Sequence, residues 1–272
     1  MAAAVLVTYS RLDPAETYHV SHEGLAGALS RTLTLVNFPI ALVAIALVLV
    51  AMGVLPRTAW WIAAPAIALC ATVPLFVDQD DLDARLGNAL PALGVVIAVG
   101  LTAAATGRVG AAFAPRRPWD LWRLVLAAAV GLVSLPWIAA ELGFHFPGDV
   151  FMGEELGSES DGPSIAAVHL GHHHGTDGAL LVLTALLLSR VAIANRALRV
   201  FTFAYLGAML SYGGMNLAQD AWNEQVVKRG WTDEGIPSAL LPAVEPVWGV
   251  IVVIAVVMTV VLLREEKSYS AR

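Results

Sequence analysis

Four of the seven histidines lie in one short stretch, His169-Leu-Gly-His172-His173-His174-Gly-Thr-Asp177. On a helix, His169, His173 and Asp177 are four residues apart and fall on one face. His172 flanks that face, and His174 points away from it. Neutral imidazole and carboxylate are the usual ligands of zinc, iron, copper and nickel. The stretch therefore predicts a metal site immediately before an apolar segment.

Ligand-type side chains at four-residue spacing recur at the ends of two other apolar segments. Glu141 and His145 stand near the end of one. Asn216, Asp220 and Glu224 stand near the end of another. This spacing places each set on one helix face. If these faces turn inward, the segment ends converge on a shared site, as in helix bundles that bind ligands between their helices.

These positions define the predicted site. The metal ligands are assigned to four histidines: His145, His169, His172 and His173. Three acids are assigned to catalysis. Either Glu141 or Asp177 is the ligand or base, and Glu155 is a lid residue. Asn216 and Asp220 are further candidates, because a polar residue within a membrane span is costly and usually functional. Zinc or iron is the expected metal, because a single cysteine and few methionines on that side disfavour a Cu(I) site.

Each motif also has a simpler interpretation. A histidine-rich tract can be a solvated loop with incidental metal affinity. Glu141 and His145 can serve as hydrogen-bonding groups at a helix end. The glycine- and serine-rich stretch 147–164 can be a lid over the site or a plain linker.

The composition restricts the class of protein. The chain has 272 residues, of which 58% are hydrophobic and 14% charged, and its mean hydropathy is +0.71. These values are typical of an integral membrane protein. The single cysteine, Cys70, excludes an intrachain disulfide and a cysteine-based zinc site. No feature suggests nucleic-acid binding.

Seven segments are long and apolar enough to span a bilayer: 33–54, 59–77, 88–106, 121–140, 176–195, 199–219 and 245–263. Pro39, Pro74 and Pro136 fall inside three of them and predict kinks. We therefore expect an all-α, seven-helix membrane bundle in three parts. These are an amphipathic lead-in at 1–32, a membrane domain at 33–263 with an outer loop at 141–175, and a tail at 264–272.

Basic residues predict the orientation. The loops after the first, third and fifth segments, with the C-terminal tail, hold most of the 16 Lys and Arg residues, so this side should be cytoplasmic. The N-terminus then lies outside and the C-terminus inside the cell membrane. All seven histidines and most of the acids fall outside. Tryptophans near both boundaries, including Trp137 at the outer one, are expected to anchor the protein in the membrane.

Seven spans with an outside N-terminus resemble the rhodopsin topology, but the last segment, 245–263, has no lysine for a retinal Schiff base. The same topology resembles the progestin-receptor and alkaline-ceramidase hydrolases. Those families place a His-x-x-x-His pair in the last span, and here that span has no histidine. The resemblance is confined to topology and implies no site residues.

Three functions fit the sequence. The first is a metal-dependent enzyme acting on a lipid or small apolar substrate at the extracytoplasmic membrane boundary. The second is metal uptake, delivery or sensing through the same histidines and acids. The third is a structural or assembly protein with no metal site. Membrane lipids are the expected surroundings in every case, and the sequence does not determine the oligomeric state.

Overall fold

The computed structural model of the chain describes residues 20–76, 81–113, 120–141, 155–156, 165–166, 174–237, 239 and 245–270. These parts are helical apart from one antiparallel pair of two-residue strands, β1 (Glu155–Leu156) and β2 (Ile165–Ala166). The helices are α3 (Gly24–Met52), α4 (Trp60–Cys70), α5 (Ala89–Ala112), α6 (Asp120–Val133), α7 (Leu135–Glu141), α8 (His174–Leu188), α9 (Arg196–Trp222) and α10 (Val247–Ser270). A π-helical turn, Asn223–Val227, follows α9.

Each segment selected by hydropathy contains a helix, and α6 and α7 share one segment. Among the described residues, four regions are long and apolar enough to cross a membrane: Gly24–Met52, Arg57–Leu75, Leu86–Gly110 and Val247–Glu265. The apolar helix Gly175–Leu188 is shorter. An all-helical fold is therefore confirmed, together with four candidate membrane-spanning helices.

The prolines behave differently from one another. Pro39 lies within α3, and the helix continues through it. Pro74 lies in a 3-10 turn after α4 has ended. Pro136 is the second residue of α7, just after the interruption that separates α7 from α6. The expectation of a kink is wrong for Pro74, because α4 has already ended there. The one-residue interruption before Pro136, with i to i−4 hydrogen bonds on both sides of it, agrees with a kink in the 121–140 segment.

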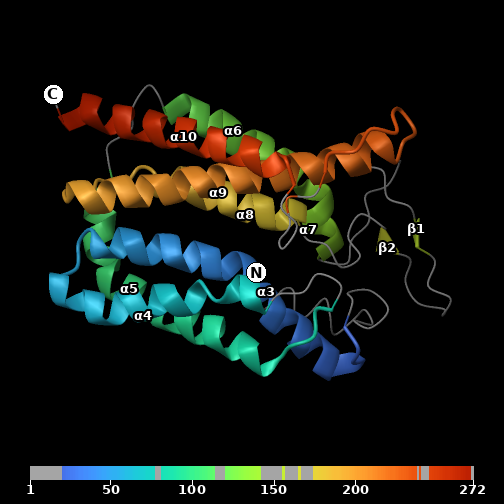
Figure 1. The fold of residues 1–272 in the computed structure, drawn as a ribbon, viewed down its shortest axis with the longest axis horizontal. Coiled ribbons are helices and arrows are strands. Elements are labelled where there is room, and N and C mark those ends of the chain that lie inside the picture. The colour runs from blue at the N-terminus through green and yellow to red at the C-terminus, as the bar shows by residue number, and fades with distance from the viewer. Residues whose placement is uncertain are drawn as a thin grey trace.

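The helices form two groups (Figure 1). In the first, α3 packs against α4 and α5; in the second, α9 packs against α8 and α10. Contacts of α3 with α8 and α9 join the two groups. In Figure 1, α7 and the two strands lie at one end of the bundle, called here the α7 end. The C-terminal part of α10 lies at the opposite end, called here the C-terminal end.

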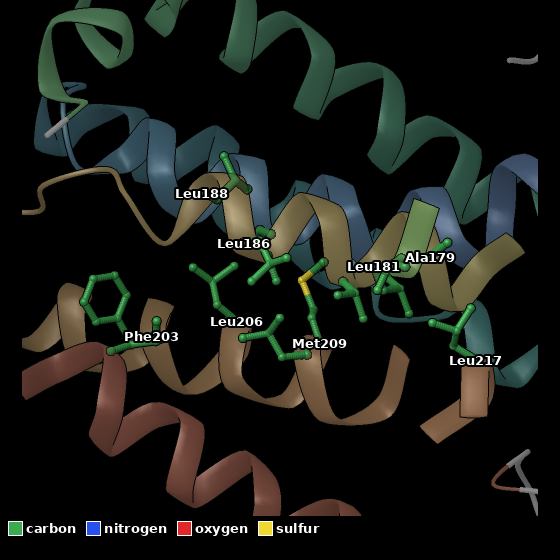
Figure 2. Close-up of a cluster of buried hydrophobic side chains, with 14 of the residues drawn as sticks. Ala179, Leu181, Leu186, Leu188, Phe203, Leu206, Met209 and Leu217 are labelled. Carbon is green, nitrogen blue, oxygen red and sulfur yellow. The ribbon is translucent and has the colours of Figure 1, made fainter. Parts of the chain in front are cut away.

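A cluster of buried apolar side chains fills the interface between α8 and α9 (Figure 2). Leu181 and Leu206 are completely buried there. The two backbones approach closely, because a Cβ atom added to Gly178 would lie 2.5 Å from the carbonyl oxygen of Gly213. Small residues allow this approach in membrane proteins, where helices associate mainly through close packing. The interface holds the first residues of α8 against the last turns of α9.

Large apolar side chains also cover the outside of the bundle. Trp61 on α4 is 88% exposed, and Val253 on α10 is 63% exposed. Contiguous exposed apolar faces on several helices are unstable in water and are typical of helices that face lipid. The outer surface is thus compatible with a membrane protein.

Candidate functional site

At the α7 end, a buried acid of α9 meets the start of α8. The backbone N–H of Gly175 donates a hydrogen bond of 2.5 Å to Oδ2 of Asp220, which is 8% exposed. The first N–H groups of a helix have no partner within the helix and attract a carboxylate. A Cβ atom on Gly175 would lie 2.4 Å from the ring of Trp137. The helices α7, α8 and α9 therefore meet here, as the four-residue spacing requires for a shared site.

A second acid follows one turn later. Nε1 of Trp137 donates a hydrogen bond of 2.8 Å to Oε2 of Glu224, in the π-helical turn after α9. Burial raises the pKa of Glu224 to about 8; the Trp137 bond and Lys228 oppose the shift, and the neighbouring Asp220 adds to it. Trp137 is completely buried, so its expected role as a membrane anchor is wrong. It packs inside the protein because its indole N–H has a buried acceptor.

A third set of polar side chains lies on α8 and α9, next to the start of α10. Asp177 is buried, and both its carboxylate and the amide of Asn216 lie within interaction range of the Tyr212 hydroxyl. Tyr212 also stacks on Trp248 of α10, with ring centroids 5.6 Å apart. Asn216 is completely buried, and neither of its amide atoms makes a hydrogen bond of normal geometry. Buried polar groups usually have partners, so this amide requires an explanation.

The described part of the predicted site is thus assembled at one end of the bundle. Asp177, Asn216 and Asp220 lie there on α8 and α9. Glu141 is the last residue of α7 and Glu155 the first of β1, and their side chains are outside the described part of the chain. So are the predicted ligands: His145, His169, His172 and His173. Their assignment remains a prediction.

The acids at the α7 end do not make a metal site by themselves. Within the described ranges, no group of three or more His, Cys, Asp or Glu side chains is placed to hold a metal ion. Asp220 is oriented by a backbone N–H and Glu224 by an indole N–H. These two acids can accept or donate a proton but need other residues to complete a coordination sphere.

The opposite end contains a charge network that sequence reasoning did not identify. Arg123 on α6 is 7% exposed, and its Nη2 lies 2.6 Å from Oε2 of Glu265 on α10. Its Nη1 lies 3.3 Å from Oδ1 of Asp120, and its Nε donates to the hydroxyl of Ser189 at 3.1 Å. Arg190 is 3.1 Å from Oδ2 of Asp120. In the sequence analysis, the arginines of this network served only to predict which side of the membrane is cytoplasmic.

This network joins the start of α6, the segment after α8 and the last turns of α10. Both acids and both arginines are paired within it. A buried charge whose partners and hydrogen bonds are in place has no remaining demand for a ligand. The charges at this end of the bundle therefore stabilise the packing of α6, α8 and α10.

No family model matches the chain, and neither the curated proteins nor the solved structures give a match. The class of protein therefore follows from the fold alone. It is an all-helical protein with four apolar helices compatible with a membrane.

Proposed function

We propose that the chain is a seven-helix integral membrane protein whose α7 end lies outside the cell membrane and binds a transition metal, zinc or iron. The metal would serve a reaction on a lipid or small apolar substrate. The four candidate spans support the membrane assignment, and α6–α7, α8 and α9 lie in the same bundle. The basic residues favour the orientation, because most of them belong to loops of the other end.

The observation that supports the metal site is the bond between Gly175 and Asp220. His172 and His173 precede Gly175 by three and two residues. Because consecutive Cα atoms are ~3.8 Å apart, the backbone of both histidines must start within ~11 Å of this contact. His172 and His173 are therefore close along the chain to the buried acids Asp177 and Asp220. Mixed nitrogen and oxygen donors fit zinc or iron better than calcium or Cu(I).

The acids would transfer protons at this site. A bound metal would supply a Lewis acid or an activated water. Glu224 carries its proton near neutral pH, because its pKa is about 8, and can donate it to a leaving group. Trp137 fixes the position of that carboxyl group. Asp220 is held in place by the start of α8 and can orient the segment that carries the histidines.

Metal analysis of purified protein tests the proposal. Protein prepared without a histidine tag should contain stoichiometric zinc or iron, and the double change His169→Ala with His173→Ala should remove it. His174→Ala is the matched control and should retain most of the metal, because on the helix predicted from the sequence it lies on a different face from His169 and His173. Metal binding should weaken as pH falls through ~6.5, where imidazole gains a proton. A wild-type protein that neither carries nor takes up a transition metal would refute the site.

A further inference from the structure

The first turns of α3 contain a buried arginine that has no partner among the described residues. Arg31 is 3% exposed, and its Nε makes no hydrogen bond. No hydrogen bond or ion pair joins the rest of its guanidinium to a described residue. An arginine keeps its positive charge inside a protein, because a guanidinium is too strong a base to lose its proton. A buried charge of this kind is strongly destabilising unless an anion pairs with it.

The segment before α5 packs against the same turns of α3. The backbone N–H of Ala84 donates a hydrogen bond of 2.6 Å to the hydroxyl of Ser30, the residue immediately before Arg31. The hydroxyl of Thr34, one turn later, donates a hydrogen bond of 2.8 Å to the carbonyl of Leu82. These two bonds hold residues 82–84 beside the part of α3 that carries the buried arginine. Acids on this segment are therefore its nearest possible partners along the fold.

The two described acids of this segment are bound to other groups. The carboxylate of Asp83 accepts hydrogen bonds from the hydroxyls of Ser21 and Ser30. The carboxylate of Asp81 pairs with the guanidinium of Arg85, four residues later. Neither acid forms an ion pair with the buried arginine, although the segment lies beside it. An anion from outside the chain is therefore favoured as the partner of this charge.

The place of Arg31 along α3 indicates the class of anion. α3 is one of the four candidate membrane spans, and its apolar run was expected to begin at residue 33. Arg31 precedes that run by two residues, or ~3 Å along the helix axis. Leu25 and Leu29 on the same helix are 66% and 54% exposed, which is typical of a surface that contacts acyl chains. Arg31 therefore lies near the boundary between acyl chains and headgroups, where phospholipid phosphates are the abundant anions.

We propose that the guanidinium of Arg31 binds the phosphate group of an anionic phospholipid. A guanidinium matches a phosphate through two parallel N–H···O bonds, and one phosphodiester charge balances one arginine. A headgroup without an ammonium group is favoured, because no second cation then competes for the phosphate. The bound lipid would stabilise the start of α3 against residues 82–84. The site contains no imidazole and does not depend on the proposed transition-metal site.

Thermal unfolding of the full chain in mixed micelles tests the lipid site. Micelles that contain phosphatidylglycerol should raise the Tm to a plateau, above the value in the same mole fraction of phosphatidylcholine. Arg31→Gln should abolish the difference between the two lipids. Arg57→Gln, which removes an exposed arginine just before α4, is the matched control and should preserve it. Native mass spectrometry should detect a retained phosphatidylglycerol on wild type and Arg57→Gln and lose it on Arg31→Gln.

Several results would overturn the proposal. Equal Tm values in the two lipids would do so, as would a full rise with inorganic phosphate alone, which would make the ligand a free anion. If Arg31→Gln fails to fold, Arg31→Lys decides, because a lysine keeps the charge but cannot form the paired bonds; an undiminished lipid difference there refutes the site. The double change His169→Ala with His173→Ala should keep the lipid effect. Its loss in that variant would place the lipid at the metal site instead.

Discussion

The raised pKa of Glu224 leads to a prediction that can be tested without knowing the substrate. Burial raises the pKa of this carboxyl group from 4.5 to about 8. The folded protein therefore binds the proton more tightly than the unfolded chain does. The contribution of this proton to the free energy of unfolding is complete below pH 4.5. It is lost as pH rises through 8, because between these two values only the folded state holds the proton.

The size of the effect follows from the shift. One pKa unit corresponds to ~1.36 kcal/mol, so the free energy of unfolding should fall by about 3–5 kcal/mol across the window. The lower figure allows for the partial exposure of Glu224. Glu224→Gln keeps an acceptor for the Trp137 N–H but has no proton to lose. Relative to wild type, the variant should gain about 3–5 kcal/mol between pH 5 and pH 9.

Unfolding curves of both proteins in detergent at pH 5, 7 and 9 measure this difference. The comparison isolates Glu224, because Asp220 and the histidines are present in both proteins. Glu234→Gln is the control, since Glu234 is exposed in the following loop and its replacement should leave the pH dependence unchanged. If Glu224→Gln shows the same pH dependence as wild type, the carboxyl group is not buried in the way described.

Two further predictions concern packing and the charge network. Arg123→Met should cost about 3–5 kcal/mol in unfolding free energy, because it removes the buried cation that pairs with both Asp120 and Glu265, and adding Glu265→Leu should recover part of the loss. Gly178→Val should cost about 1–3 kcal/mol or more, because its Cβ would meet the carbonyl of Gly213, whereas Gly214→Val has no atom within 4 Å of its Cβ and should cost less. Thermal unfolding in detergent checks both, and equal losses for the two glycine variants would contradict the packing argument.

Hydropathy could place the helices because each buried or lipid-facing helix needs a continuous apolar run. It could not place their ends, which depend on tertiary contacts. α3 begins at Gly24, nine residues before the expected span. Thr34 in this helix donates a hydrogen bond of 2.8 Å to the carbonyl of Leu82, which a hydropathy profile does not reveal. Local composition thus indicates that a helix forms but does not reveal its first residue or its distant contacts.

The candidate site, too, was predictable from the sequence only in part. The spacing of Asn216 and Asp220 predicted that they share one face of a helix, because helical periodicity fixes which residues share a side. Both are buried on α9, which the spacing alone did not determine. Trp137 was assigned to the membrane boundary because isolated tryptophans near segment ends usually lie there. Its partner, Glu224, is 87 positions away, and no local pattern connects them.

Buried charges are compensated differently at the two ends of the bundle. At the C-terminal end, Arg123 has acids on two sides, so the charges there satisfy one another. At the α7 end, Asp177 and Asp220 are buried, and burial raises the pKa of Glu224 to about 8. An arrangement of this kind is stable only if protons or cations complete it. The proton on Glu224 and the metal proposed beside the histidines would both supply positive charge to the buried carboxyl groups at this end.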